Sequence, residues 1–542
     1  MIFVRQRTFL IAAVLVGGIS SLGIELTASR LLQPFFGSSQ LIWANVIGLT
    51  LIYLTIGYRL GGRLADRRPE LPMLGRILLA AGLATAPIPL IARPILQWSA
   101  TAFQTYSIGV FFGSFFGVLL LFSAPIVLLG MVSPFAIRLS MRDVATAGST
   151  AGSLYALSTL GSIIGTFLPV LVLIPTVGTN ITFYIFALAL VTLGAIGMGR
   201  RAMLVAVPAV IALMALQLGV QGIREPFCAS SGCVSLYEAE STYNYIQVAK
   251  LPAGVNGSER IGLILNEGQA IHSVYNTRYA QTGDPADLLT GGPWDFFNVA
   301  PYVYPDRTKD EVQSLLMIGS AAGTIPKQFL AFYGANARID AVEIDPAIVE
   351  VGRTYFDMND QQFPNYRVFT EDGRVYLRRT TEAYDVIGMD AYKQPYIPFH
   401  LTTREFFDEV NAKLASNGVA VVNAGKPGTD YRLVDTLATT MRSVFPQVFI
   451  LDVPNFGNSI IIGVKQPVSD GVANFNANMQ RMTDATLQFL MQQALDSNSR
   501  KLPLREWTAQ DAAASRPFTD DWAPVESVID RIILRAAESG IQ

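Results

Sequence analysis

The chain has 542 residues, of which 51% are hydrophobic and only 15% charged, and its net charge is −2. This length predicts two or three domains, and the composition excludes a disordered chain, a collagen, a coiled coil and a small disulfide scaffold. Residues 1–220 hold 13 arginines, no lysine and 4 acids, a charge of +9, whereas the remainder holds 27 basic and 38 acidic residues, a charge of −11. This asymmetry predicts two physically different parts.

The first part, residues 1–220, predicts a transmembrane domain of about seven helices. A transmembrane helix needs about 20 mainly apolar residues, and seven such stretches are bounded by arginine, proline or glycine-rich breaks. They are Phe9–Arg30, Leu41–Leu60, Leu74–Leu96, Ser107–Met131, Ala151–Val177, Ile181–Met198 and Met203–Val220. The first stretch is too long for the apolar region of a signal peptide, and six more follow it.

Arginines accumulate in alternate loops of this part. Arg5 and Arg7 precede the first stretch and further arginines follow the second, fourth and sixth, whereas Leu31–Gln40 and Pro175–Asn180 contain no lysine or arginine. Because cytoplasmic loops are rich in basic residues, we expect a multi-pass protein of the plasma (inner) membrane with a cytoplasmic N-terminus. Seven spans then favour the non-cytoplasmic side for residues 221–542, and a change of one span reverses that side.

Residues 221–305 predict a linker and a small β unit. The only two cysteines, Cys228 and Cys233, lie here in a Ser/Gly-rich loop. A disulfide between them requires an oxidising compartment, and two reduced thiols without a role are the alternative. A zinc site is not expected, because two thiolates fill half of a tetrahedral shell. Tyr245–Val248 and Ile261–Leu265 are short β-type runs around a turn, which predicts antiparallel strands.

Residues 306–542 predict a doubly wound α/β domain. Strand-like runs alternate with helical stretches, a pattern typical of a parallel sheet with helices on both faces. The expected strands are Ser314–Ile318, Ile339–Ile344, Tyr366–Thr370, Tyr384–Met389 and Gly418–Asn423, and the expected helices are Ile325–Tyr333, Pro346–Phe356 and Thr402–Leu414. Such sheets bind ligands at the carboxyl ends of their strands.

Glycines and acids follow four of these strands. They are Gly319 and Gly323 after the first strand, Glu343 at the end of the second, Asp372 and Gly373 after the third, and Asp390 after the fourth. The glycines let the backbone approach a ligand closely. Glu343 lies near the spacing at which an acid accepts both hydroxyls of a ribose. The set predicts a nucleoside site other than an NADP site, and a glycine-rich turn without a ligand is the alternative.

These residues lie in segments that resemble, in order and spacing, the core of spermidine synthases. The segments are Leu316–Gly323, Val342–Pro346, Glu371–Gly373 and Tyr384–Asp390. Upstream, Glu240–Asn244 is similar to that family's Glu-Ser-x-Tyr-Gln segment, with Asn244 at the glutamine position. Segments that look like hallmarks of membrane-fused members are Ile397–Phe407, Thr519–Glu526, Glu25 and Gly61–Asp66.

The resemblance implies a fold of the S-adenosylmethionine-dependent methyltransferase type. It also implies an aminopropyl transfer to a small cationic amine. The co-substrate would be decarboxylated S-adenosylmethionine, or S-adenosylmethionine itself, with no metal. The implied binding residues are Glu343 for the ribose, Asp372 for the adenine amino group, Gly319 and Gly323 for the methionine-derived part, and Gly373 and Asn244 beside them. The lipid bilayer is an expected partner and nucleic acid is not; a homo-oligomer stays open.

The acceptor side departs from the family pattern. Ala322 stands where the family's glycine loop carries Asp, and Lys393 aligns with the second acid of the family's Asp-Ser-x-Asp-Pro segment. Because a lysine repels a cationic amine, we expect an altered acceptor site. Asp390 is then the first candidate base, Tyr392 a candidate for orienting the substrate, and His400 a second candidate base, since a histidine side chain can accept a proton.

Three functions stay open from the sequence. The first is a membrane-tethered aminopropyltransferase, which the acids Glu343, Asp372 and Asp390 favour. The second is a catalytically lapsed polyamine- or nucleoside-binding or transport-coupled membrane protein, which Ala322 and Lys393 favour. The third is an S-adenosylmethionine-dependent methyltransferase, which could use the same fold and nucleoside residues.

Overall fold

The chain divides by its contacts into two compact units in a computed structural model. The first unit comprises residues 1–225 with 238–245, and the second residues 226–237 with 246–542. The structure describes residues 2–36, 40–105, 109–141, 143–218, 228, 232–253, 258–266, 270–392, 397–426, 428–497, 501–508, 516–529 and 531–532. Lys393 and the first residues of the expected linker, 221–227, lie outside the described residues. The three-domain division at residues 220 and 305 stays a prediction.

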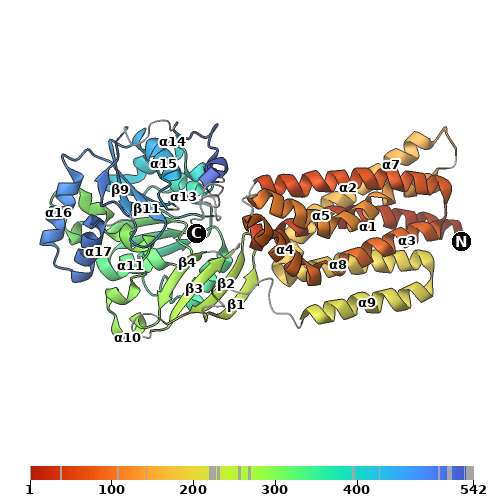
Figure 1. Ribbon diagram of the computed structural model, residues 1–542, viewed down its shortest axis with the longest axis horizontal. Helices are drawn as coiled ribbons and strands as arrows, with labels where there is room; N and C mark the ends of the chain where they lie inside the picture. Colours follow the sequence, from red (N-terminus) through yellow and green to blue (C-terminus); the bar gives the residue numbers. More distant parts are fainter. Residues whose placement is uncertain are drawn as a thin grey trace. The chain divides into compact units, whose positions relative to one another are not determined.

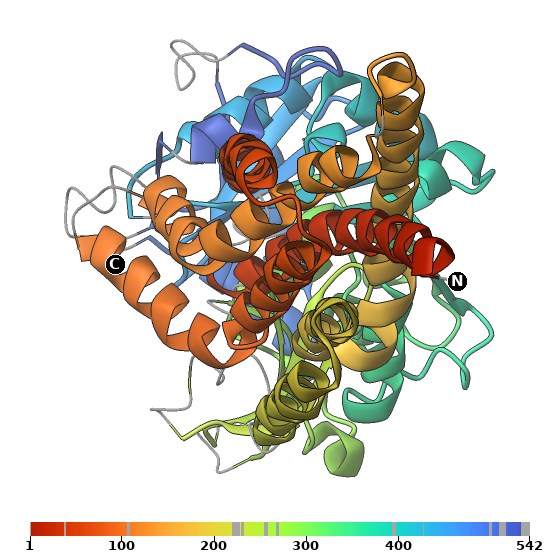
Figure 2. The same ribbon diagram turned by 90° about the vertical axis from the view of Figure 1, so that its right-hand side faces the viewer.

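The described part of the first unit is helical. Its elements are α1 (Ile2–Phe36), α2 (Gln40–Arg67), α3 (Leu71–Thr85), α4 (Ile88–Thr105), α5 (Gly109–Gly130), α6 (Val132–Ser140), α7 (Ala147–Leu168), the π-helical turn η1 (Pro169–Leu173), α8 (Ile174–Met198) and α9 (Arg200–Leu218). Several of these helices run side by side (Figure 1). Helix α1 contacts each of α2 to α8 and passes through the middle of the bundle (Figure 2).

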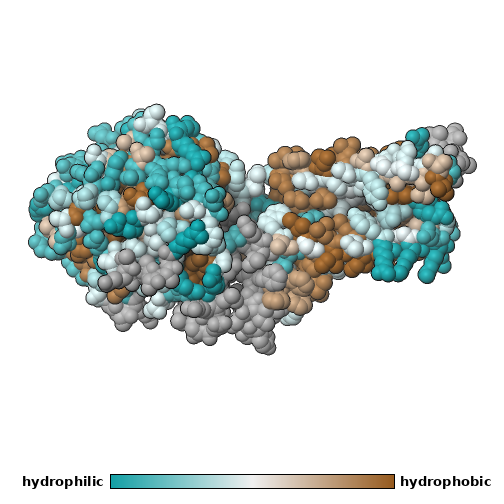
Figure 3. Space-filling model, turned by 90° about the horizontal axis from the view of Figure 1, so that it is seen from above, coloured by the Kyte–Doolittle hydropathy of each residue, from teal (hydrophilic) through white to brown (hydrophobic). Residues whose placement is uncertain are grey.

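Long apolar helices confirm the expected membrane-type helices but not seven separate ones. Four runs in the described residues could cross a membrane by length and composition: Gln6–Phe36, Ile42–Arg67, Phe112–Ser140 and Ala147–Met198. Leu71–Thr85 and Ile88–Ser99, bent by 52°, form a fifth if they count as one span, and Arg201–Gln217 is a shorter apolar helix. Hydrophobic residues cover much of this unit in Figure 3, whereas the other unit is mostly hydrophilic on the face shown.

The fifth and sixth predicted stretches lie on either side of a kink at Gly178, where two helices meet without a separate loop between them. Pro175, at the start of the predicted break, lies in the first turn of α8, where a helix tolerates proline. The backbone departs from helical geometry only at Gly178, whose φ is 82°. The run has 52 residues, and the kink divides it within the break that the sequence predicts at Pro175–Asn180.

Glu240 stabilises the break at Gly178. Its carboxylate accepts hydrogen bonds from the backbone N–H and the hydroxyl of Thr179, each at 2.5 Å. An anion is favourable at this place because the helix that restarts at Thr179 has a positive N-terminal end. On α1, Arg30 donates to the backbone oxygens of Ser241 and Tyr243. Residues 238–245 therefore belong to the first unit by specific polar contacts.

Three helix pairs of this unit meet through glycines. A Cβ added to Gly165 in α7 would lie 2.2 Å from the backbone oxygen of Ile19 in α1. Glycines play the same role where α2 meets α5 and where α3 meets α8, at Gly57 and Gly194. Small residues let apolar helices approach until their backbones touch.

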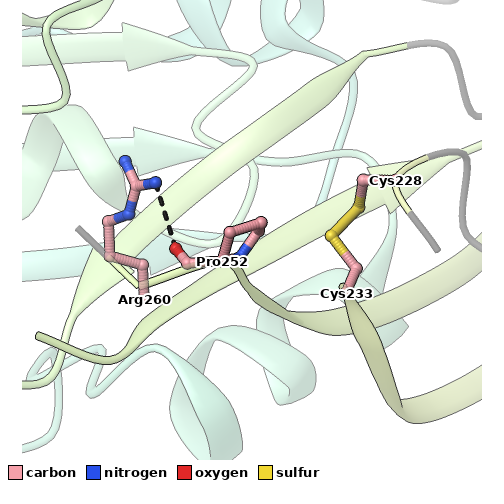
Figure 4. The surroundings of a disulfide bond; sticks show 4 residues. All are labelled: Cys228, Cys233, Pro252 and Arg260. Atoms are coloured by element: carbon pink, nitrogen blue, oxygen red, sulfur yellow. Dashed lines mark hydrogen bonds between the residues drawn. A yellow bond between two sulfur atoms is a disulfide. The ribbon is translucent and has the colours of Figure 1, made fainter. Parts of the chain in front are cut away.

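A four-stranded sheet and a disulfide confirm and extend the expected β unit. Its strands are β1 (Val234–Glu240), β2 (Tyr245–Leu251), β3 (Arg260–Leu265) and β4 (Ile271–Asn276), in that spatial order. β3 pairs antiparallel with both β2 and β4. Cys228 and Cys233 form a disulfide with their Cα atoms 5.4 Å apart (Figure 4). Beside it, Arg260 donates to the backbone oxygen of Pro252 at 3.2 Å.

An eight-stranded mixed sheet forms the centre of the second unit. Its strands are β5 (Ser314–Ile318), β6 (Arg338–Val342), β7 (Tyr366–Phe369), β8 (Tyr384–Met389), β9 (Leu414–Gly425), β10 (Gln447–Asp452), β11 (Asn458–Val464) and β12 (Arg505–Glu506). The spatial order is β12-β10-β11-β9-β8-β5-β6-β7. Strands β5 to β9 pair in parallel and β11 runs antiparallel to β9. The fold is that of S-adenosylmethionine-dependent methyltransferases, as expected.

Helices cover both faces of this sheet (Figure 1). Leu315 and Met317 pack with α11, α16 and α17, whereas Leu316 and Ile318 pack with α13, α14 and α15. The helices are α10 (Tyr279–Thr282), α11 (Thr324–Tyr333), α12 (Pro346–Tyr355), α13 (Gly373–Arg379), α14 (Arg404–Lys413), α15 (Arg432–Arg442), α16 (Gly471–Arg481) and α17 (Ala485–Leu495). Short 3-10 turns are η3 (Pro285–Leu288), η4 (Pro293–Asn298), η5 (Ala300–Val303), η6 (Lys309–Glu311) and η7 (Phe399–Leu401).

Enlarging Gly165 should destabilise the helical unit. We expect Gly165→Ala to lower the melting temperature of the detergent-solubilised chain by several degrees, because the added carbon overlaps the α1 backbone and overpacking costs about 1–3 kcal/mol. Gly152→Ala on the same helix is the control, since no atom lies within 4 Å of its added carbon. Equal melting temperatures for the two variants would contradict this account of the α1–α7 contact.

Candidate active site

The loops after β5 and β8 meet at the carboxyl edge of the sheet. The sheet order reverses between these two strands, which is where such sheets bind ligands. Gly319 has a φ of 77°, and a Cβ on it would lie 2.6 Å from the Cα of Ala391. The backbone N–H of Asp390 donates to the oxygen of Ile318 at 3.0 Å. Glycine is therefore required at 319, and the fold brings it next to Asp390.

The glycine loop is fastened to β4. The backbone N–H of Ala322 donates to the hydroxyl of Ser273 at 3.0 Å, and Thr324 Oγ1 accepts from the N–H of Val274 at 3.0 Å. Ala322, which stands where the family carries Asp, is buried in the apolar cluster between β2–β4 and α12. Gly323 has a φ of 88° and begins α11. The loop is thus a turn between β5 and α11 that two hydrogen bonds attach to β4.

Glu343 follows β6 and reaches the glycine loop. Its Oε2 accepts from the backbone N–H of Ala321 at 2.9 Å, and its Oε1 from that of Asp345 at 3.1 Å. Burial raises the pKa of the carboxyl to about 7, although these two donors oppose the shift. Glu343 can therefore change charge near neutral pH, and a ligand with hydroxyl donors would favour its ionised form.

Asp372 and His400 form a pair. Asp372 Oδ1 accepts from the backbone N–H groups of Arg374 and Val375 and so caps α13. Its Oδ2 lies 3.0 Å from His400 Nε2. This hydrogen bond, with the helix N–H groups, holds the pKa of Asp372 below its ordinary value against the effect of burial. The predicted catalytic residue His400 thus lies beside the predicted cofactor residue Asp372.

Gly373 allows the start of α13 to pack closely against the end of β5. A Cβ there would lie 2.3 Å from the Cγ2 of Ile318, so the start of α13 lies directly on the end of β5. Arg374 then joins α13 to the family-like segment 519–526, since it donates to both oxygens of Asp520 at 2.7 and 2.9 Å. Thr403 also donates to Asp520, at 2.7 Å. Asp520 therefore fixes the surroundings of His400.

Asp390 is largely buried and its two oxygens accept different donors. Trp294 Nε1 donates to Oδ2 at 2.8 Å, and Asn423 Nδ2 donates to Oδ1 at 2.9 Å. Burial raises the pKa of Asp390 to about 6, and the two donors limit the rise. Tyr392 lies beside it: its hydroxyl donates to the oxygen of Asn423 at 2.9 Å and accepts from the N–H of Gly425 at 3.1 Å.

Sequence reasoning missed Trp294 and Asn423. Asn423 lies near the carboxyl end of β9, the fifth parallel strand, so the strand-end rule could have found it. Trp294 lies in η4, before the first strand of the sheet, and only the folded chain brings it to Asp390.

The predicted residue Asn244 and the chain's other histidine, His272, have different surroundings. Asn244 belongs to the first unit, where its N–H donates to the hydroxyl of Ser241 at 2.9 Å. His272 lies on β4, and its Nε2 has no hydrogen-bond partner among the residues that the structure describes. Within the same part of the chain, no group of three or more His, Cys, Asp or Glu side chains could hold a metal ion.

Replacing Glu343 should remove a pH dependence of stability. The unfolded side chain ionises near pH 4.5 and the folded one near 7, so the folded state holds the extra proton between these values. The free energy of unfolding therefore falls as pH rises through this window, by about 3 kcal/mol. We expect Glu343→Gln to melt higher than the parent at pH 8 and close to it at pH 4.5.

The control for this measurement is Glu350→Gln on α12, whose side chain is 72% exposed. It should follow the parent at both pH values in the same thermal unfolding experiment on the full chain. A Glu343→Gln protein that loses as much stability as the parent between pH 4.5 and 8 would show that Glu343 is not the titrating group.

Solved structures of similar fold include spermidine synthases. A probable spermidine synthase from Corynebacterium glutamicum is 19% identical, with a TM-score of 0.40, over 52% of this chain and 96% of that one. The spermidine synthase of Thermotoga maritima is 18% identical, with a TM-score of 0.34, over 46% of this chain and 78% of that one.

Comparisons of the amino-acid sequence indicate the family more specifically than the solved structures do. The spermine/spermidine synthase domain matches residues 304–469. A probable polyamine aminopropyl transferase of Bifidobacterium longum is 31% identical over 321 residues, 56% of this chain and 65% of the relative's length. The polyamine aminopropyltransferase of Vibrio vulnificus is 32% identical over 248 residues, 44% of this chain and 77% of the relative's length. Because it is 32% identical to this relative over more than two thirds of the relative's length, the chain belongs to the polyamine aminopropyltransferase family.

Proposed function

We propose that the protein is a membrane-tethered aminopropyltransferase with an altered acceptor site. The observation that carries this proposal is the Asp390 carboxylate at the sheet's topological switch, with a pKa raised to about 6 in a chain of this family. A group of this kind is ionised at neutral pH, attracts a cationic amine and can accept its proton.

The nucleoside end of the site would be formed by the first three strand ends. The glycine loop 319–323 offers backbone without side chains, and Glu343 offers a carboxylate that can accept the hydroxyls of a ribose. Asp372 offers Oδ2, shared with His400, to an adenine amino group. These groups fit decarboxylated S-adenosylmethionine, which supplies a sulfonium leaving group.

The acceptor end would depend on Asp390. The attacking nitrogen forms a bond to the methylene carbon beside the sulfonium, and the carbon–sulfur bond breaks with its electron pair left on sulfur. The proton of the nitrogen passes to the Asp390 carboxylate. Because only the ionised carboxylate can accept it, the rate should rise with pH through about 6. Tyr392, held by Asn423 and Gly425, would line the path of the amine.

The acceptor would differ from that of standard family members. The Ala322 methyl group is buried in an apolar cluster, so the loop offers no acid there, and the sequence supplies Lys393 in place of the second acid. We expect the amine to carry less positive charge than a diamine, since one carboxylate can pair with one ammonium group.

Purified full-length protein, decarboxylated S-adenosylmethionine and a panel of mono- and diamines should yield methylthioadenosine and an aminopropylated amine, detected by mass spectrometry. We expect Asp390→Asn to lower the rate about 100-fold or more, the usual contribution of a general base. Asp306→Asn, whose side chain is 81% exposed, should keep the parent rate.

The lapsed-enzyme and methyltransferase alternatives give different outcomes. Binding of methylthioadenosine without turnover of any amine would support a lapsed binding protein. Methylation with S-adenosylmethionine but no aminopropyl transfer would support a methyltransferase. Either result contradicts the proposed transfer.

The helical unit would anchor the protein in the plasma (inner) membrane, with the α/β unit on the non-cytoplasmic side. The arginine pattern and the Cys228–Cys233 disulfide support this side, because disulfides persist in oxidising compartments. We expect alkaline phosphatase fused after Gln542 to be active and a green fluorescent protein fused there to be dark. The reverse pattern would place the unit in the cytoplasm.

A further inference from the structure

The indole N–H of Trp294 donates to the carboxylate that the proposed chemistry uses, at 2.8 Å from Asp390 Oδ2. We infer that Trp294 is a positioning residue that, together with Asn423, fixes the Asp390 carboxylate in one orientation toward the acceptor amine. This inference rests on the proposed function for its catalytic meaning. Its geometric part, a carboxylate fixed by two donors, can be tested without any turnover.

A carboxylate needs such fixing because its terminal torsion is soft. The torsion that turns a carboxylate is broad, unlike the staggered torsions of aliphatic side chains. An ionised carboxylate has about four acceptor positions, two on each oxygen. Trp294 and Asn423 use one position on each oxygen of Asp390. One position on each oxygen is left for the nitrogen of an acceptor.

A buried polar network holds the turn that carries Trp294. The carboxylate of the next residue, Asp295, accepts from the backbone N–H groups of Thr290 and Gly291 and from Nε2 of Gln328, at 2.7 to 3.1 Å. Asn298 joins the same network, since its Nδ2 donates to Oε1 of Gln328 at 3.0 Å. Gln328 lies on α11, so η4 is fastened to the helix that follows the glycine loop.

The side-chain amide of Asn423, the second donor to Asp390, is also held in one orientation. Asn423 Oδ1 accepts from Asn458 Nδ2 at 3.0 Å, on the neighbouring strand β11. Since that bond uses the oxygen of the amide, the Asn423 NH₂ group is directed at Asp390. Tyr392, whose pKa is raised by burial and by the charge of Asp390, is the titratable neighbour that contacts the same asparagine.

Trp507, another buried tryptophan of this unit, serves as a comparison for the indole N–H of Trp294. Both tryptophans are buried, with exposed fractions of 9% for Trp294 and 5% for Trp507. The indole N–H of Trp507 has no hydrogen-bond partner among the described residues, whereas that of Trp294 meets a carboxylate. Packing alone accounts for Trp507 but not for the placement of Trp294.

The test compares Trp294→Phe with Trp507→Phe in the full-length protein. Phenylalanine retains an aromatic ring and removes the N–H donor. Infrared difference spectra against Asp390→Asn, recorded over a pH series, report the protonation of Asp390 directly. Because a donor to a carboxylate favours the ionised form, we expect Trp294→Phe to raise the titration midpoint of Asp390 by about one pH unit. Trp507→Phe should leave it unchanged.

The same variants give a kinetic readout. In Trp294→Phe the pH at which the transfer rate is half-maximal should rise by about one unit. The kcat at neutral pH should fall, and the KM for the co-substrate should change little. Asn423→Ala is the second variant and should shift the midpoint in the same direction, which keeps the test decisive if Trp294→Phe fails to fold. An unchanged Asp390 midpoint in the folded variants overturns the inference. A shifted midpoint in a protein without transfer activity retains the positioning role and refutes the proposed function.

Discussion

A carboxylate that leaves water must be given hydrogen-bond donors, and this requirement organises the carboxyl edge of the sheet. Glu343 takes its donors from the glycine loop and from the start of α12, and Asp372 takes them from α13 and His400. Asp390 takes them from η4 and β9. Each acid therefore fastens a loop that comes from a different part of the chain, and together they fix the shape of the candidate site.

Burial of these acids costs stability, and it also shifts the pKa of two of them toward neutral pH. It raises the pKa of Glu343 to about 7 and that of Asp390 to about 6, whereas the hydrogen bond to His400 keeps Asp372 ionised. Buried groups that titrate near neutral pH are typical of acid–base sites. The chain thus lowers the pKa of one acid and raises the pKa of two others, which suits the proposed site, where a nucleoside would bind and a proton would be accepted.

The helical unit is stabilised by a different constraint. Its long apolar helices could cross a membrane, and in lipid such helices would gain little from burying side chains against each other, so close backbone contact would contribute instead. Glycines at the α1–α7, α2–α5 and α3–α8 contacts make this approach possible. At Gly178 the helix breaks, and the carboxylate of Glu240 satisfies the N-terminus that the break exposes. The family-like segment 240–244 therefore has contacts with helices in this protein.

The amino-acid sequence was enough to predict the two parts, from their charge asymmetry, and the doubly wound fold, from its alternating strand and helix patterns. It was also enough to predict Gly319, Glu343, Asp372 and Asp390, because each follows a strand closely in the chain. All of these signals are local. The sequence placed a break within Pro175–Asn180 but did not place the kink at Gly178, since Pro175 can begin a helix as well as end one. It also did not reveal the last strands of the sheet or the roles of Trp294 and Asn423. Trp294 lies 96 positions from Asp390 in the chain. Which donor meets a buried carboxylate depends on contacts between distant segments, and only the tertiary structure brings those segments together.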